Sequence, residues 1–300
     1  MNIVMQYGVN STEISHDKWD IAFVGLNIDE RCNAARSFVQ LNTKKTIEVV
    51  YNATEYTIKI DDEEIDVDLL DKYLIDEGIC SLKVLIDCTS TGVAELLVLM
   101  QCLYDIENKN FDILYLEPKQ YTASNKSFVE KRNFELSLGV EGYIGIPGQS
   151  LAFERTDKAV FFCGYESERL DRTFEELDIV GKNSQLIFGI PPFSAGWDMN
   201  SYSNHISVIE RQNINKRFYY CGAANPLAVC QKLDVFYHAL SDEERLFIIP
   251  IGTKPMAIGA CVYKVSKNNN SKLSILYDHP KKKQGRSADI SRWNLYNIML

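Results

Sequence analysis

Several familiar sequence signals are absent from this chain of 300 residues. It contains no run of about eighteen apolar residues, which a membrane-spanning helix would require. The stretch before Asp20 also lacks the basic segment and the following apolar segment that mark a secretory signal peptide. We therefore expect a cytoplasmic protein that does not enter a membrane.

Motifs that identify common catalytic and cofactor sites are missing as well. There is no GxGxxG fingerprint, no GxxxxGK[ST] phosphate loop and no G-x-S-x-G nucleophile elbow. The 8 cysteines are scattered without a CxxC pair, and no histidine lies at zinc-ligand spacing. We expect mostly buried thiols, because a free cysteine packs as a small apolar side chain, and we expect neither a metal nor a cofactor.

An excess of negative charge excludes a general attraction to nucleic acid or anionic lipid. The chain has 41 acidic and 32 basic residues, and its formal net charge is -9. One basic run follows the last predicted strand and contains Lys281, Lys282, Lys283 and Arg286. This run is either a solvated tail or a contact for phosphate or nucleic acid, and we expect no nucleic-acid binding elsewhere.

What is present predicts an α/β protein with about two domains. A chain of this length can bury a sizeable core without disulfides, and its apolar fraction of 46% is ordinary for a globular protein. In the first half, short apolar runs alternate with segments of helical periodicity. The predicted strands are 20–24, 46–51, 83–87 and 111–116, and the predicted helices are 29–39, 69–77 and 93–104. Glu117 and Pro118 are the predicted stop of the last strand.

The second half repeats this order, which indicates an internal duplication. The sequence Phe-Val-Gly-Leu-Asn-Ile-Asp-Glu-Arg at 23–31 is similar to Phe-Cys-Gly-Tyr-Glu-Ser-Glu-Arg at 162–169. Ile-Leu-Tyr-Leu-Glu-Pro at 113–118 is likewise similar to Ile-Leu-Tyr-Asp-His-Pro at 275–280. The predicted strands here are 159–163, 186–190, 245–251 and 273–277, and helices begin near 168, 226 and 256.

We therefore predict two tandem Rossmann-like halves with mainly parallel sheets, related by a pseudo-two-fold axis. The first half covers 1–148 and the second covers 149–300, with an inserted segment at about 186–240. Halves of this kind can also share one continuous sheet.

Four segments follow predicted strands at the positions where open α/β sheets bind ligands. Backbone N–H groups at the start of the next helix attract negative charge there, and small residues let a ligand approach the backbone. Hydroxyl groups can also donate hydrogen bonds to phosphate oxygens. The candidate ligand-binding residues are Gly25, Asn27, Arg31, Thr89, Ser90, Thr91, Gly164, Arg169, Gly252, Thr253 and Lys254.

Two of these features also have a purely structural explanation. In Gly252-Thr253-Lys254-Pro255, glycine allows a tight turn, threonine can cap the helix, lysine supplies a charge and proline suits the first helical turn. A well-capped helix without a ligand needs the same residues. Arg31 and Arg169 each follow a glutamate and could clamp a phosphate or carboxylate, or form a salt bridge between domains.

The strand followed by Asp87-Cys-Thr-Ser-Thr-Gly92 and a helix, together with the strand followed by Gly252-Thr253-Lys254, resembles the CRISPR-associated Rossmann-fold (CARF-like) nucleotide-sensing domains. The resemblance covers most of the chain in layout and short motifs in sequence. It implies that cyclic oligoadenylates bind on a two-fold axis between two copies, which would here be fused in one chain. Residues 252–254 would then face residues 89–91. The first-half loop has no lysine, so a symmetric ligand would be held asymmetrically.

The resulting prediction is a protein that binds or senses a nucleotide, or a related phosphorylated small molecule, at a cleft between the halves, in a bacterial antiviral defence system. One alternative is an enzyme that cleaves a phosphodiester or glycosidic bond of such a ligand, with Glu30, Asp87 or Glu168 as acid or base. The other alternative is a structural subunit with a protein partner in a multi-subunit complex. That partner would bind residues 191–197 and the aromatic residues Tyr202, Phe218, Tyr219 and Tyr220.

Overall fold

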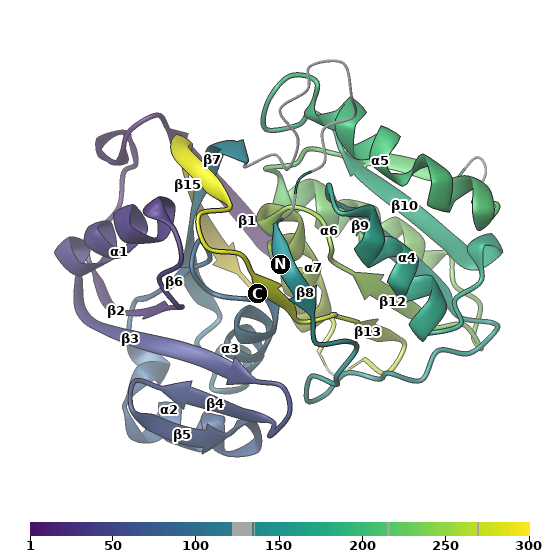
Figure 1. The fold of residues 1–300 in the computed structure, drawn as a ribbon. Helices are drawn as coiled ribbons and strands as arrows, with labels where there is room; N and C mark the ends of the chain where they lie inside the picture. The colour runs from purple at the N-terminus through teal and green to yellow at the C-terminus, as the bar shows by residue number, and fades with distance from the viewer. Residues whose placement is uncertain (122–133, 135, 215–216, 269) are drawn as a thin grey trace. The chain divides into compact units, whose positions relative to one another are not determined.

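The structure is a computed structural model that describes residues 1–121, 134, 136–214, 217–268 and 270–300 (Figure 1). It is an α/β protein, as predicted, and the chain divides into two compact units. The first unit contains residues 1–120 and 284–300, and the second contains residues 121–283. Each unit has a sheet of its own. A pseudo-two-fold relation between the halves stays a prediction.

The first unit is built on a mixed sheet of eight strands in the order β1-β15-β7-β6-β2-β3-β4-β5. Four neighbouring strands, β7, β6, β2 and β3, run parallel, while β1 is antiparallel to β15, and β4 is antiparallel to both β3 and β5. The strands are β1 (Asn2–Gly8), β2 (Trp19–Val24), β3 (Thr43–Asn52), β4 (Thr57–Ile60), β5 (Glu63–Asp66), β6 (Val84–Asp87), β7 (Asn110–Tyr121) and β15 (Ser287–Met299).

Helices cover both faces of this sheet, which explains why β2 and β6 are mostly apolar and buried. The helices are α1 (Glu30–Asn42), α2 (Leu70–Asp76) and α3 (Val93–Asp105), with α1 on one face and the other two on the opposite face (Figure 1). Ala22 and Val24 of β2 pack against Ala35 and Val39 of α1 in one buried cluster. A strand buried on both faces lacks the alternation of a half-exposed strand, so β2 and β6 read as continuous apolar runs.

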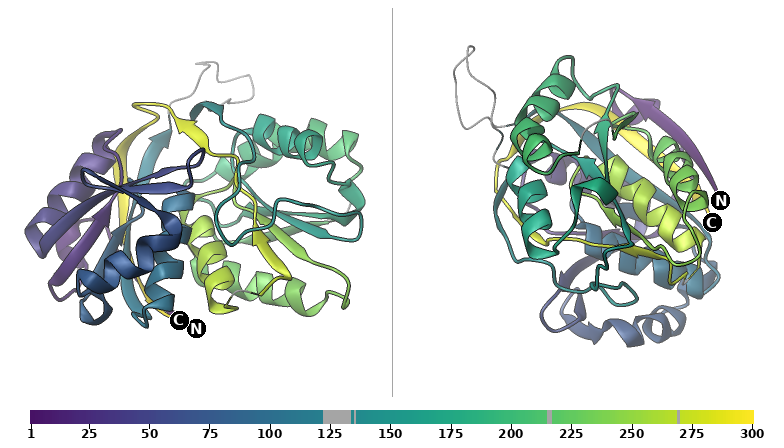
Figure 2. Two further views of the ribbon diagram at one scale, coloured as in Figure 1. Left: turned by 90° about the horizontal axis from the view of Figure 1, so that it is seen from below. Right: turned by 90° about the vertical axis from the view of Figure 1, so that its right-hand side faces the viewer.

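The second unit has a five-stranded parallel sheet in the order β11-β10-β9-β12-β13. This order, with the first strand in the middle, is that of a doubly wound α/β sheet. Helices α4 and α5 pack on one face and α6 and α7 on the other (Figure 2). The elements are β9 (Lys158–Cys163), α4 (Ser167–Glu176), β10 (Ser184–Gly189), α5 (Trp197–Arg211), β11 (Phe218–Cys221), α6 (Pro226–His238), β12 (Leu246–Ile249), α7 (Lys254–Ser266) and β13 (Leu273–Ile275).

The segment 186–240, expected as an insertion, lies inside this sheet. It supplies most of β10, all of β11 and the helices α5 and α6. Pro226 occupies the first turn of α6, as predicted, and Asn225 caps that helix by accepting a hydrogen bond from the Ala228 N–H at 2.9 Å. The segment is therefore part of the doubly wound order.

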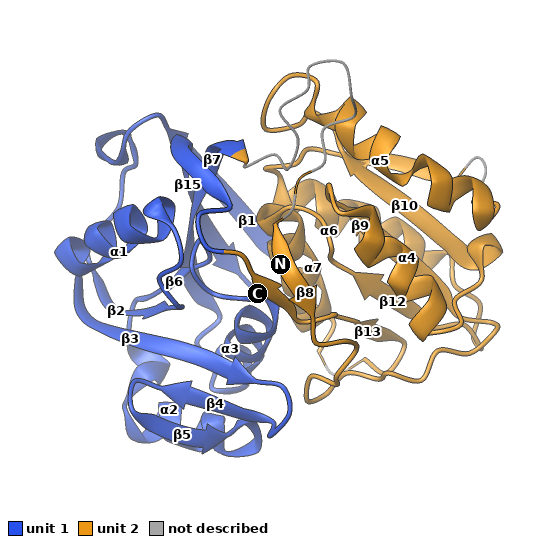
Figure 3. Cartoon of the chain, in the orientation of Figure 1, with its two compact units in different colours: residues 1–120, 284–300 blue, residues 121–283 orange. Residues whose placement is uncertain are grey.

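The C-terminal region is the main departure from the expected layout. Residues 287–299 form β15, which lies between β1 and β7 in the sheet of the first unit (Figure 3). The units consequently differ in their bounds from the expected 1–148 and 149–300. Part of the basic run is also ordered, because β14 (Pro280–Lys282) pairs with β8 (Ser137–Val140) in a separate antiparallel ribbon.

Two smaller predictions have clear outcomes. The predicted strand stop at Glu117 and Pro118 is wrong, because β7 continues to Tyr121. The last residue of β7 paired with β6 is Leu114, so Pro118 lies beyond that ladder, where a proline is tolerated.

The prediction of mostly buried thiols is confirmed, since Cys80 alone among the described cysteines is exposed. No helix in the described ranges is long and apolar enough to cross a membrane.

Candidate ligand-binding site

The loops after β2 and β6 lie in contact in the first unit, on either side of the point where the strand order changes direction. The Gly25 N–H donates a hydrogen bond of 2.8 Å to Ser90 Oγ. A Cβ atom on Gly25 would lie 2.6 Å from the backbone of Ser90, so only glycine fits there. The structure thus brings two of the predicted segments together.

The hydroxyl groups of the 89–91 loop are buried and form hydrogen bonds within the chain. Thr89 Oγ1 accepts from the Leu116 N–H at 3.0 Å, and Thr91 Oγ1 donates to the carbonyl of Asp87 at 3.1 Å. Ser90 Oγ donates to the carboxylate of Asp87, which is itself fully buried. In this structure these hydroxyls hold the loop between β6 and α3 in place.

Arg31 belongs to a buried network at the start of α1. Its guanidinium donates to Ser287 Oγ at 2.8 Å, to the Leu116 carbonyl at 2.7 Å and to Asp29 at 3.3 Å. Burial raises the pKa of the Asp29 carboxyl. Arg31, Ser287 and the Cys32 N–H lower it by a larger amount, so the net pKa lies below its ordinary value. The ion pair that the sequence suggested for Arg31 lies within one unit. Asn27 is exposed nearby.

The second unit shows the same arrangement at the loops after β9 and β12. A Cβ atom on Gly164 would lie 2.5 Å from the Ile251 carbonyl oxygen, and one on Gly252 would lie 3.0 Å from the Phe162 carbonyl oxygen. Thr253 caps α7 by accepting from the Met256 N–H at 3.4 Å, and it donates to the Ala223 carbonyl at 2.6 Å. The predicted cap is therefore confirmed. Lys254 is the first residue of α7 and is partly exposed.

A cavity of about 480 Å³ lies beside one predicted loop of the second unit, and we call it the α4 pocket. It is lined by strand β8, by residues 165–169 and Arg172, and by Phe134, Asn204 and Lys283. Three of these residues are cationic, Arg169, Arg172 and Lys283, and two are acidic, Glu166 and Glu168. The pocket is found where β9 ends and α4 begins, at the carboxyl edge of the sheet, which is where ligands bind in such folds.

The first turn of α4 has no side-chain cap. Glu166 occupies the cap position, but its carboxylate instead accepts hydrogen bonds from the N–H groups of Leu136 and Ser137, each at 3.0 Å, and from Ser137 Oγ at 2.7 Å. Helices α1 and α7, by contrast, are capped by Asp29 and Thr253. The positive end of the α4 dipole therefore has no capping oxygen from Glu166 at the pocket.

Two arginines of the pocket differ in how firmly they are held. The side chain of Arg169 is only 11% exposed and forms a two-point ion pair with Asp278, at 2.7 Å and 2.5 Å. Burial lowers the pKa of Arg169, but Asp278 raises it by more, so the guanidinium stays charged. Arg172 is 48% exposed and pairs with Glu176 one turn along α4, a kind of ion pair that contributes little energy and yields readily to a competing anion.

Aromatic side chains and α5 complete the pocket. The rings of Phe134 and Tyr165 lie 5.1 Å apart between centroids, and both pack against Trp197 at the start of α5. Asn204 of α5 donates to the Tyr165 carbonyl at 3.1 Å, and Ser201 Oγ donates to the Gly164 carbonyl. Helix α5 thus fixes the backbone of the loop that follows β9.

Sequence reasoning found part of this site and missed part of it. Gly164 and Arg169 were candidates, and Lys283 was noticed only as a member of the basic run. Phe134 and Asn204 were missed, because their contribution depends on the packing of segments far apart in the chain. Arg172 was also missed, although its position three residues after Arg169 on one helix was the signal that could have found it. Of the proposed acid or base residues, Glu168 lines the pocket, Glu30 is exposed, and Asp87 is fully buried and bonded to Ser90.

No family model matches the sequence, and a search of curated proteins finds no match. Within the described ranges, no group of three or more His, Cys, Asp or Glu side chains could hold a metal ion. The fold and the pocket therefore define a class, an α/β protein with a doubly wound parallel sheet and a cavity at its carboxyl edge.

Proposed function

We propose that the second unit binds a nucleotide or another small phosphorylated molecule in the α4 pocket. The observation that carries the proposal is the meeting of three cationic side chains with a helix N-terminus that lacks a side-chain cap, all at one cavity. Phosphate oxygens accept hydrogen bonds from both kinds of group. A volume of about 480 Å³ lies within the range of pockets for small organic ligands.

The aromatic wall favours a nucleotide over a simple phosphate. Phe134 and Tyr165 lie on the lining beside Ser167, the first residue of α4, so a base could contact their rings while the phosphate meets the helix end. Glu168 also lines the α4 pocket and would repel a ligand with many negative charges. The pocket therefore favours a ligand of low negative charge.

Binding can be tested by calorimetry with AMP, ADP and a cyclic oligoadenylate. Lys283→Ala should weaken the affinity about tenfold, since a charge-assisted hydrogen bond to phosphate is lost. Lys281→Ala is the matched control, because Lys281 lies two residues earlier on β14, is exposed, and does not line the pocket. Absence of binding by all three compounds, or an equal effect of both variants, would overturn the proposal.

Two further measurements separate the alternatives. If Lys254→Ala weakens binding and Lys283→Ala does not, the ligand binds at the 252–254 loop instead of the α4 pocket. Product analysis after long incubation decides between a binding protein and an enzyme, because a nucleotide that stays intact excludes turnover. If the nucleotide is cleaved and the cleavage disappears in Glu168→Gln, the activity belongs to the α4 pocket.

A further inference from the structure

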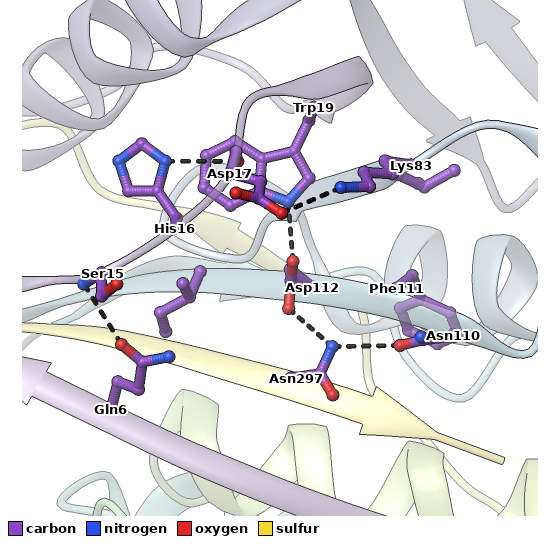
Figure 4. A pocket seen from close by; sticks show the side chains of 12 residues that line it. Gln6, Ser15, His16, Asp17, Trp19, Lys83, Asn110, Phe111, Asp112 and Asn297 are labelled. Carbon is purple, nitrogen blue, oxygen red and sulfur yellow. Dashed lines mark hydrogen bonds and ion pairs between the residues drawn. The ribbon is translucent and has the colours of Figure 1, made fainter.

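A second cavity, of about 290 Å³, lies in the first unit, at the end of the sheet opposite the loops after β2 and β6 (Figure 4). Its lining includes Trp19 at the start of β2, Phe111 and Asp112 near the start of β7, and Asn297 near the end of β15. We call it the Asp112 pocket. It shares no residue with the α4 pocket.

The floor of this pocket is a chain of hydrogen bonds that fixes its polar groups in place. Asp112 accepts from the indole N–H of Trp19 at 2.7 Å and from the amide of Asn297 at 3.0 Å. The same amide donates to Asn110 Oδ1 at 3.0 Å. Figure 4 shows the carboxylate of Asp112 between Trp19 and Asn297. A site whose groups are already oriented loses little entropy when a ligand binds.

The charge of the floor is not balanced by a protein cation. Both partners of Asp112 are neutral donors, and in the described part of the chain Asp112 forms no ion pair. The lysine of the lining, Lys83, is 61% exposed and pairs with Asp17 at 3.1 Å. Each oxygen of Asp112 uses one of its acceptor sites for a neutral donor and has another for a ligand.

We propose that the Asp112 pocket binds the ammonium group of a small aliphatic amine. The ammonium would donate to Asp112, and a short hydrocarbon body would lie against Val84, Phe111 and Leu295. An anion would meet an uncompensated carboxylate, and a neutral alcohol would lack the charge that strengthens the hydrogen bond. The chemistry of the floor therefore selects a cation.

The indole N–H of Trp19 reports directly on this site, because it donates to the carboxylate that the ammonium would contact. In an NMR titration with n-propylammonium we expect a saturable shift of the Trp19 indole signal. The signals of the two other tryptophans, Trp197 and Trp293, serve as internal controls, since neither lines the pocket. The titration is repeated with 1-propanol, which has the same hydrocarbon body and no charge.

Asp112→Asn should weaken n-propylammonium binding by at least about tenfold, because the charge is removed and the shape is kept. Asp62→Asn, which removes an exposed carboxylate outside the lining, should leave binding unchanged. The proposal is overturned if n-propylammonium does not shift the Trp19 signal, if 1-propanol shifts it equally, or if both variants bind alike. The comparison of amine with alcohol needs no variant, so it remains decisive if Asp112→Asn does not fold.

Discussion

Glu117 is a buried carboxyl group with only part of its hydrogen-bonding capacity satisfied. It is 3% exposed, and one oxygen accepts from Ser291 Oγ at 2.9 Å, while the other has no hydrogen-bond partner within the described structure. Burial raises the pKa of this carboxyl by more than Ser291 and Arg292 lower it. The folded protein therefore holds this proton more tightly than the unfolded chain does, and stability is lost as the pH rises through the raised pKa.

Glu117→Gln should stabilise the protein at about pH 8 by roughly 1–3 kcal/mol, because the buried charge disappears. At about pH 4 the Glu117 carboxyl of the unchanged protein is protonated in both the folded and the unfolded state, so the gain in stability should vanish. Urea unfolding at the two pH values measures this difference. Glu55→Gln, which removes an exposed carboxylate of the same unit, should change neither value. An equal effect of Glu117→Gln at both pH values would contradict the argument.

Helices α1, α6 and α7 each begin with a side-chain cap, and each uses a different residue. Asp29 accepts from the Cys32 N–H at the start of α1, Asn225 caps α6 and Thr253 caps α7. In α4 the cap residue Glu166 bonds to β8 instead. A helix end without such a cap is less stable on its own but leaves its N–H groups available, which is why we place the ligand there.

Thr253→Ala should destabilise the second unit by about 1–2 kcal/mol, because the cap of α7 and the bond to the Ala223 carbonyl are both lost. Thr253→Ser retains the oxygen and should restore most of the stability. Denaturant midpoints of the three proteins test this, and a Thr253→Ala protein as stable as the unchanged chain would show that the cap has no energetic role.

The first unit depends on both ends of the chain. Strand β15 lies between β1 and β7, so its backbone pairs on both sides, and its Ser287 and Ser291 bond to Asp29 and Glu117. A truncated chain without 287–300 would leave β1 without its partner and one edge of β7 unpaired.

We expect this truncation to unfold much of the first unit. Hydrogen exchange of β7 and β6 should become at least about a hundredfold faster than in the complete chain, whereas Met299→Ala, a change confined to the strand end, should leave it slow. Unchanged protection of β6 and β7 after truncation would mean that β15 is not needed for the sheet.

Local features of the chain were readable from the sequence because they depend on neighbouring residues. The predicted strand 20–24 and helix 93–104, like the cap and proline at Thr253 and Pro255, follow from periodicity and from the chemistry of one turn, and the structure places them within one residue of their bounds. Gly25 and Gly164 were picked out as ligand-binding positions, which stays a prediction, and their close packing against Ser90 and Ile251 was not predictable.

Tertiary structure decided which distant segments meet. Residues 287–299 become an interior strand only because they pair with β1, almost the whole chain away, on one side and with β7 on the other. Lys283 and Asn204 join the loop after β9 through the packing of β14 and α5, and Asp112 becomes a binding candidate only beside Trp19 and Asn297. Sequence periodicity determines which face of a segment is buried. Long-range packing determines which other segments that face packs against, and binding sites arise from this long-range packing.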